Sequence, residues 1–245
     1  FFSLNNIMCQ TNEIGVFVGG SMFHGDIGYN NAENAILQSK ATIGIQYKRN
    51  FNYHFGVNIT LKRGELFADD SYSKDPLNVI RNLHFRSKIT EFCLMAEFNF
   101  RPYLSRDSEY NSTPFIFTGI TKFYFNPQRQ SSDGNWYNLR AIGTEGQGSD
   151  LYPESELYEL SGLAIPLGLG YKINVYDFIT ININLSWRFT FTDYIDDVST
   201  VYVNKNLLSE LGAELADLSE IGLSPGTQRG NPNNNDKFGF LGVTI

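Results

Sequence analysis

The segment 179–191 alternates without a break between apolar residues at odd positions and polar residues at even positions, and it ends in Trp-x-Phe-x-Phe. A β-strand points successive side chains to opposite faces, so this segment presents one apolar face and one hydrophilic face. About 9–11 tilted residues are enough to cross a bilayer as a strand. A membrane barrel requires such alternation, because lipid lies outside its wall and a polar lumen lies inside.

The same alternation recurs along the chain. The further alternating segments are 13–23, 41–48, 53–62, 91–100, 114–126, 163–172 and 237–245. Together with 179–191 they predict eight strands, the smallest number found in single-chain bacterial outer-membrane barrels. We therefore predict one all-β domain over residues 10–245, an eight-stranded antiparallel transmembrane up-and-down β-barrel.

The predicted connections between these strands alternate between short and long. The short ones lie around Asn50, at 101–113 and at 174–177, and the long ones at 24–38, 67–83, 127–158 and 192–236. Outer-membrane barrels have short periplasmic turns and long extracellular loops. An even number of strands returns both termini to the same side. We therefore predict a location in the cell outer membrane, with both termini periplasmic.

Bulk properties exclude several other classes of protein. No apolar run approaches the 18 residues of a membrane-spanning helix, which excludes a helical membrane protein. A net charge of −7 argues against a nucleic-acid partner. Cys9 and Cys93 do not suggest a disulfide. Residues 1–9 are predicted to be a signal-peptide remnant or a periplasmic tail, and cleavage before Gln10 is favoured over lipidation of Cys9.

The predicted strands place aromatic residues near both ends and charged residues inside. The expected girdles are Tyr47, Tyr53, Phe98, Phe100 and Tyr171 near the periplasm, and Phe123, Phe125, Trp187, Phe189 and Phe191 near the outer side. Such girdles favour the membrane over a soluble lipocalin-like barrel. The inward charged set is Lys48, Lys62, Glu91, Glu97, Lys122, Lys172 and Arg188. In so narrow a barrel we expect these charges to pair into a closed polar plug rather than an ion path.

Residue patterns for catalysis, metals or cofactors are weak. The three histidines lack metal-ligand spacing, and His84 near Ser87 is not diagnostic of a hydrolase, so we predict no enzyme, no metal and no cofactor. Asp193, Asp196, Asp197 and Asp236 are expected to form a hydrogen-bonded loop cluster in preference to a calcium site. Leucines at helical spacing predict a helix over 205–221, which would cover the barrel mouth or offer a partner surface.

Beyond the alternation, the order of several short segments is specific. Examples are Gly-Thr-Glu-Gly-Gln-Gly at 143–148 and Arg-Gly-Asn-Pro at 229–232; the others lie at 12–20, 25–28, 81–85, 123–127, 135–139, 187–188 and 192–199. The chain resembles the PorG family of outer-membrane barrels, from the type IX secretion system of Bacteroidetes, over nearly its whole length after residue 9. The insert at 205–221 does not match that family's pattern.

The resemblance implies a non-enzymatic role in protein export and gliding. The barrel would anchor or organise a periplasmic ring made of a lipoprotein and a soluble partner (PorK and PorN, or their gliding counterparts), while outer-membrane lipid surrounds its wall. Two other functions stay open: a small closed-lumen porin-like barrel, and a surface adhesion or receptor barrel acting through its long loops.

A periplasmic ring can touch only the short turns and the rim beside them. Arginine and tyrosine are enriched at protein interfaces, and both occur in the longest short connection. The predicted partner-binding residues there are Arg101, Tyr103, Arg106 and Tyr110, with Asn50, Asn52, Tyr176 and Asp177 as secondary contacts. An ordinary solvated turn is the alternative.

Overall fold

Eight antiparallel strands close into a barrel in the computed structural model, which describes residues 11–28, 32–104, 110–176 and 178–245. The strands are β1 (Thr11–His24), β2 (Lys40–Asn50), β3 (Phe55–Asp69), β4 (His84–Asn99), β5 (Ser112–Tyr124), β8 (Ser161–Tyr176), β9 (Ile179–Thr190) and β10 (Lys237–Thr244). Each strand pairs with its neighbours, and β1 pairs with β10 to close the wall. The predicted fold is confirmed. Residues 1–9, including Cys9, lie outside the described residues.

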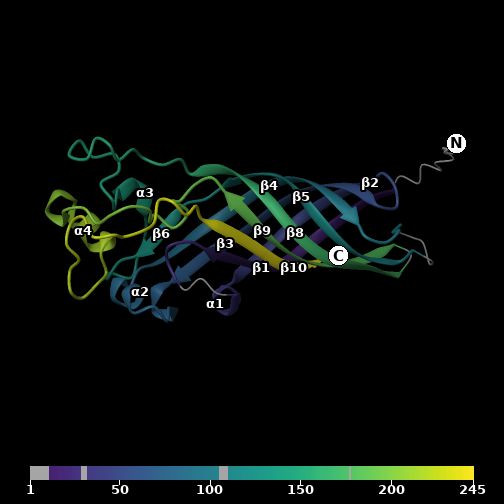
Figure 1. The fold of residues 1–245 in the computed structure, drawn as a ribbon, viewed down its shortest axis with the longest axis horizontal. Helices are drawn as coiled ribbons and strands as arrows, with labels where there is room; N and C mark the ends of the chain where they lie inside the picture. Colours follow the sequence, from purple (N-terminus) through teal and green to yellow (C-terminus); the bar gives the residue numbers. More distant parts are fainter. Residues whose placement is uncertain (1–10, 29–31, 105–109, 177) are drawn as a thin grey trace.

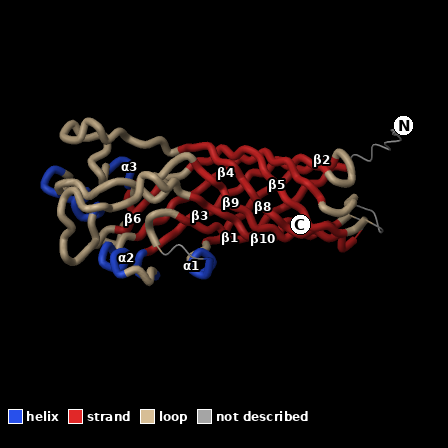
Figure 2. Tube along the Cα trace, in the orientation of Figure 1, coloured by secondary structure: helices blue, strands red, loops and turns tan. Residues whose placement is uncertain are grey.

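The long connections gather at one end of the barrel (Figures 1 and 2). They contain the remaining elements: α1 (Ala32–Leu37), the 3-10 turn Asp70–Tyr72, α2 (Pro76–Arg81), β6 (Pro127–Gln130), β7 (Trp136–Asn138), α3 (Leu139–Ile142), the 3-10 turn Lys205–Leu207 and α4 (Glu210–Ala216). We call this the loop end. The other end, where the short turns lie, β1 begins and β10 stops, is the turn end.

The predicted helix over 205–221 is wrong in length. It is replaced by a 3-10 turn and the seven-residue helix α4. The side chain of Ser209 accepts a hydrogen bond from the backbone N–H of Gly212 and so starts α4 at that point. Asp217 has an extended backbone, and its carboxylate accepts hydrogen bonds from the backbone of Ser219 and Leu223, which turns the chain away from the helix.

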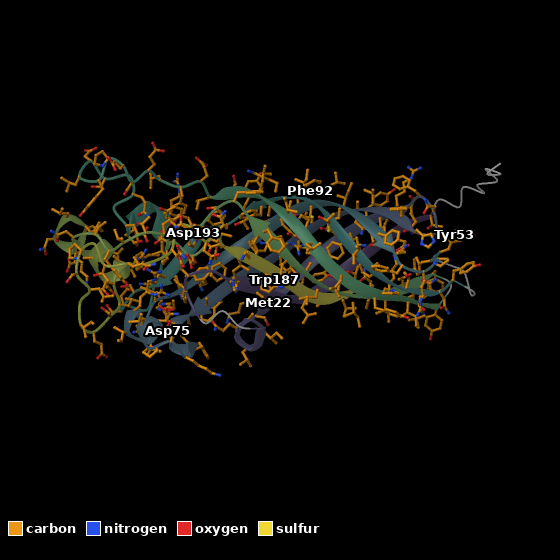
Figure 3. The ribbon with its side chains drawn as sticks, viewed as in Figure 1. Met22, Tyr53, Asp75, Phe92, Trp187 and Asp193 are labelled. Atoms are coloured by element: carbon orange, nitrogen blue, oxygen red, sulfur yellow. The ribbon has the colours of Figure 1, made fainter. Side chains whose placement is uncertain are left out.

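The barrel wall is apolar outside and polar inside. In β9, Ile183 and Phe189 are 55% and 42% exposed, whereas Asn184 and Arg188 between them are buried. Phe92 lies on the outer wall, as Figure 3 shows. This distribution is that of a membrane barrel and the reverse of a soluble lipocalin-like barrel. No helix in the described part of the chain is long and apolar enough to span a membrane.

Two layers of charged residues cross the lumen, as predicted. Near the turn end, Glu97 accepts hydrogen bonds from Lys48 at 2.5 Å and from Lys172. Towards the loop end, Arg188 donates to both oxygens of Glu91 at 2.8 and 2.7 Å, and Lys62 lies 3.8 Å from the same carboxylate. All six side chains are buried.

Strand β5 faces the opposite way from the sequence-based expectation. Lys122 points outward, where it donates to Ser161 at 3.0 Å, while Phe123 is buried. Phe125, just beyond the strand, is buried as well, so the predicted inward place of Lys122 and the girdle role of both phenylalanines are wrong. The inward rings of β5 fit inside the barrel because they lie opposite glycines of β8, which have no side chain to occupy that space. Phe117, for example, is paired with Gly168. The other predicted girdle residues lie on the outer wall.

Gly168 tests this account of β5. A Cβ atom there would lie 2.2 Å from Cζ of Phe117 and 2.6 Å from Cβ of Ser186. We expect Gly168→Val to lower the free energy of unfolding by ~1–3 kcal/mol, because the lumen has no space for the added methyl groups. Urea unfolding in detergent measures this effect. The outward neighbour change Leu169→Val is the control; equal stability of the two variants would contradict the packing explanation.

Candidate functional site

The predicted partner-binding residues at the turn end divide into exposed and buried ones. Arg101 and Asn52 are exposed, and Tyr176 at the end of β8 is 65% exposed. The side chain of Asn52 accepts hydrogen bonds from the backbone N–H groups of His54 and Phe55, which shapes the β2–β3 turn. Phe178, beside Tyr176, is 79% exposed and adds an aromatic ring that the sequence-based prediction missed.

Two of the predicted contact residues have no exposed side chain. The Tyr103 hydroxyl donates to Oδ1 of Asn174 at 2.6 Å, and its ring lies 4.2 Å from Nζ of Lys172. Asn50 is buried and donates to Glu13 at 2.5 Å. Because both side chains are buried and held by these hydrogen bonds, neither offers exposed surface to a partner. The sequence feature that could have indicated the burial of Tyr103 is the pair Tyr103–Leu104 inside an otherwise polar turn. Both residues are buried.

The remaining predicted residues keep their status as predictions. Tyr110 is partly buried and packs edge-on against Tyr53, with 5.5 Å between the ring centroids. Arg106 and Asp177 lie outside the described residues. The structure therefore brings Arg101, Asn52 and Tyr176 to the surface of the turn end, and these three carry the prediction forward.

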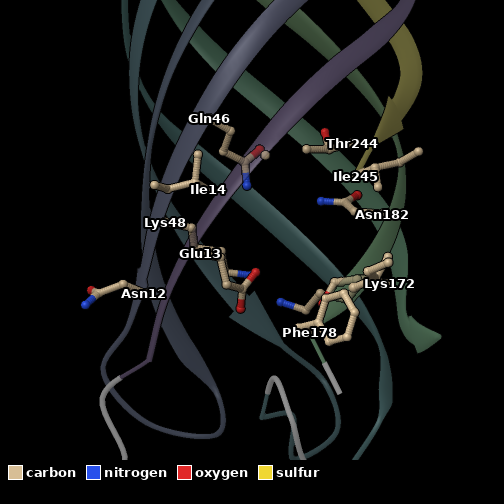
Figure 4. Close-up of a pocket in the computed structure, with 13 residues that line it drawn as sticks. Asn12, Glu13, Ile14, Gln46, Lys48, Lys172, Phe178, Asn182, Thr244 and Ile245 are labelled. Carbon is tan, nitrogen blue, oxygen red and sulfur yellow. The ribbon is translucent and has the colours of Figure 1, made fainter. Parts of the chain in front are cut away.

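A cavity of about 320 Å³ opens inside the wall at the turn end. It is lined by Glu13, Lys48, Lys172, Phe178 and Asn182 among others, and Figure 4 shows the two lysine side chains in it. The cavity lies where β10 stops, since β10 pairs with β1 only to Phe17 and with β9 only to Asn182. Both lysines pair with Glu97, and Glu13 lines the same cavity.

At the loop end, three buried arginines tie the connections into a cap. Arg229 donates to Glu145 at 2.8 Å and to the carbonyl of Asp197 at 2.7 Å. Arg81 donates to Asp70 at 2.8 and 2.9 Å and to the carbonyl of Arg229 at 2.7 Å. These bonds join segments that are far apart in the sequence, so no local pattern marks them.

The third arginine holds α4 in the cap. Arg129 donates to the carbonyl of His84 at 2.8 Å and to the carbonyl of Leu215 in α4 at 2.6 Å. Leu215 itself is fully buried. We expected the insert at 205–221 either to cover the barrel mouth or to offer a partner surface. Its helix α4 packs into the cap through Leu215, so this side of α4 is buried.

The predicted aspartate cluster is a set of hydrogen bonds to the loop backbone. Asp196 accepts from Ile27 at 3.1 Å and from Val198 at 3.0 Å, and Asp236 accepts from Ile195 at 2.8 Å. Asp197 accepts from the Tyr158 hydroxyl at 2.7 Å. No three His, Cys, Asp or Glu side chains within the described ranges are placed to hold a metal ion.

Burial changes the acidity of this cluster. It raises the pKa of Asp193 to about 8, and the nearby carboxylates of Asp26 and Glu145 add to the rise, while Ser199 opposes it. Burial also raises the pKa of Asp196 and of Asp236 well above the ordinary value. Neutral carboxyl groups under the cap are therefore favoured at moderate pH.

His84 and Ser87, the pair considered and set aside in the sequence, do not face each other in the structure. His84 and Ser87 are three residues apart on β4, so their side chains leave opposite faces of the strand. Ser87 is buried and accepts a hydrogen bond from the backbone of Asn126, whereas His84 packs edge-on against Trp136. This pair of side chains gives no support to a catalytic role.

The comparisons with known proteins place the chain in a family. The model described as "Domain of unknown function (DUF6089)" matches residues 1–141, which is more than half of the sequence. The chain belongs to this family. The match extends from the N-terminus through β7 and most of α3. No curated protein matches the chain.

Several solved structures are similar. Ail, the attachment invasion locus protein of Yersinia pestis, has 12% identity and a TM-score of 0.43, with 96% of this chain and 98% of that chain covered. Neisserial surface protein A has 8% identity and a TM-score of 0.45, with coverage of 96% and 97%. The outer membrane protein OprG from Pseudomonas aeruginosa has 9% identity and a TM-score of 0.43, with coverage of 95% and 94%.

The raised pKa of Asp193 predicts that the cap weakens at alkaline pH. A carboxyl whose pKa rises on folding contributes most stability below its unfolded pKa, near 4, and loses that contribution as pH rises through about 8. We expect backbone hydrogen exchange in 192–236, corrected for its intrinsic rate, to be faster at about pH 9 than at about pH 6. Asp193→Asn should reduce this difference, whereas Asp133→Asn, at an exposed position, should not. Equal protection of the wild-type cap at both pH values would contradict the prediction.

Proposed function

We propose that this chain is a non-conducting outer-membrane barrel that anchors a periplasmic ring of a type IX secretion system. The observation that carries the membrane location is the wall, apolar outside and polar inside. With a membrane location, the turn end would face the periplasm, because outer-membrane barrels keep their short turns there. The ring-anchoring role is supported by the resemblance of the loop segments to the PorG family and by the exposed residues of the turn end.

The lumen supports a role without conduction. Four cations and two carboxylates fill its cross-section in two layers, and phenylalanine rings pack around them. Moving an ion through the barrel would require breaking pairs that have no solvent to replace them. An anchoring barrel needs no path, whereas a porin does.

The closed lumen can be tested by conductance. The purified barrel in planar bilayers should give no large, stable channel, because the layers around Glu91 and Glu97 block the lumen. Insertion is verified separately by protease protection in vesicles. A large, stable conductance from inserted wild-type protein would contradict the closed lumen and favour the porin-like alternative.

A second candidate function is binding at the cell surface, and one feature of the cap favours it. Helix α2 exposes Leu77 at 74% and Ile80 at 45%, beside a cleft of about 380 Å³ that Leu223 also lines. Exposed apolar patches beside a cleft are typical of binding surfaces. A surface-binding barrel would use this face, whereas a ring anchor would use the opposite end.

Two double variants separate these functions. Arg101→Ala with Tyr176→Ala changes the turn end, and Leu77→Ser with Ile80→Ser changes α2. In pull-downs from membranes, the wild type and the α2 variant should recover periplasmic ring proteins, and the turn-end variant should recover several-fold less, because it loses an exposed charge and a ring.

Each outcome of this experiment tests a different claim. Failure of the wild type to recover any ring protein would contradict the anchoring function. Equal recovery by the turn-end variant would contradict only the choice of Arg101 and Tyr176. Loss of binding to cell surfaces in the α2 variant, with export unchanged, would instead support the second candidate.

A further inference from the structure

Positively charged side chains gather on one sector of the outer wall. On β3, β4 and β5, the outward rows are uncharged through the middle of the wall and become basic towards the loop end, at Arg63, Lys88 and Lys122. We call these three residues the basic strip. The described outward positions of β1, β8 and β9 carry no Lys, Arg, Asp or Glu, and β10 contributes only Lys237 at its loop end.

The strand register places Arg63 and Lys88 on neighbouring positions and Lys122 on the next strand, nearer the middle of the wall. Arg63 lies opposite Thr90, two residues from Lys88 on β4, so Arg63 and Lys88 are diagonal neighbours about 7–8 Å apart. Thr90 in turn lies opposite Tyr124, two residues from Lys122 on β5. Lys122 itself lies opposite Phe92, four residues from Lys88 on β4, so the strip spans three adjacent strands with Phe92 and Tyr124 between Lys122 and the other two residues.

More positive charge borders the strip at the rim. The Arg86 guanidinium lies 4.0 Å from the Trp136 ring, and Nζ of Lys40 lies 4.3 Å from the Phe67 ring. Contacts with aromatic rings leave the charge of a cation intact. Two acidic residues lie on these outward rows: Glu65, opposite Lys88, and Asp69, at the end of β3 opposite His84.

The strip residues are not neutralised within the described protein. None of the ion pairs among the described residues involves Arg63, Lys88 or Lys122, and Lys122 donates only to the hydroxyl of Ser161. The lumen lysines, by contrast, all lie near a carboxylate. In a chain of net charge −7, an unpaired basic strip on an apolar wall indicates an anionic ligand outside the protein.

The height of the strip identifies where that ligand lies. Arg63 and Lys88 stand eight and ten residues along their strands from the aromatic rings of Phe55 and Phe98 at the turn end. With a rise of about 3.3 Å per residue and a tilt of about 40°, this is about 20–25 Å, close to the height of the apolar band of a membrane barrel. Lys122, opposite Phe92, stands only six residues from Phe98, about 15 Å up the wall. Arg63 and Lys88 lie at the headgroup region of the outer leaflet, and the long side chain of Lys122 extends towards it.

We propose that Arg63, Lys88 and Lys122 bind the phosphate groups of a phosphorylated outer-leaflet glycolipid. Guanidinium and ammonium groups are the donors that phosphate prefers, and arginine can bind it through two hydrogen bonds. Phe92 and Tyr124, 52% and 55% exposed between the strip residues, offer apolar surface to the lipid's chains below the phosphates. This proposal rests on the outer-membrane location proposed above and adds a lipid class and its site.

The test uses the whole barrel in nanodiscs that contain either lipid A or lipid A without its phosphates. Native mass spectrometry after gentle detergent release counts the glycolipid that stays bound. The wild type should retain the phosphorylated form at least about tenfold better, since each charge-assisted hydrogen bond to phosphate adds to affinity. Millimolar inorganic phosphate should not displace it, because the apolar wall holds the chains.

Charge-matched variants test the site. Arg63→Gln/Lys88→Gln/Lys122→Gln should lose the preference for phosphorylated lipid, whereas Arg49→Gln/Lys74→Gln/Lys237→Gln, with three cations removed elsewhere, should keep it. Heat-modified migration in gels checks that both variants remain folded barrels, and the three single variants replace the triple one if it does not fold.

Separate outcomes overturn separate claims. A wild-type barrel that does not enter bilayers would overturn the membrane location itself. A barrel that enters but retains both lipids equally would overturn only the lipid-binding proposal, as would a folded triple variant that keeps the preference. Displacement by inorganic phosphate would show a site for free phosphate in place of a lipid site.

Discussion

The two buried carboxylates of β4 are the interaction on which the rest of the barrel depends. Glu97 binds lysines from β2 and β8, and Glu91 binds cations from β3 and β9, so one strand is connected across the lumen to strands on both sides. Removing one partner of a buried pair typically costs about 3–5 kcal/mol, because the other charge is left without solvent or counter-charge. These pairs connect the strands across the lumen and fill it, and inward phenylalanine rings pack beside them.

The segments that resemble the PorG family lie mainly in the cap. Arg81, Glu145, Asp197 and Arg229 come from four of those segments, and they bind one another or the backbone beside them. These segments therefore build the loop end, whatever role the barrel has. The proposed ring contacts lie at the opposite end of the barrel, so the cap and the contact surface must be tested by separate experiments.

The sequence predicted the fold well because membrane strands need strict alternation. Segment 179–191 gives β9 almost to the residue, since each of its positions has only one favourable face. The predicted facing of β5 was wrong because Phe115, Ile116 and Phe117 are consecutive apolar residues. From the sequence, either face of this strand could therefore be the lipid side. The glycines of β8 that pair with β5 decide which face points inward. That pairing joins segments far apart in the sequence, so no local pattern shows it.

The candidate sites were less predictable, for the same reason. Tyr103 lies in a turn that reads as solvated, yet hydrogen bonds to Asn174 and Thr180, both far along the chain, bury it. The arginines of the cap have partners up to 148 residues away. Local patterns carry no information about such contacts. In the aspartate cluster, the bonds from Val198 to Asp196 and from Ile195 to Asp236 stay within the loop, whereas Ile27 and Tyr158 bind the cluster from other segments.

A plugged lumen and a closed cap together restrict what this barrel can do. The cross-section is filled by ion pairs and the mouth is covered by loops that buried arginines join, which supports the proposal of a non-conducting barrel. The surfaces that remain are the wall, the cap exterior and the turn end, and each has its own chemistry. The wall has a basic strip, the cap has an apolar helix face, and the turn end has exposed arginine and aromatic groups. The proposed ring anchoring uses the turn end and the proposed lipid binding uses the wall, so the two proposals depend on different surfaces of one barrel.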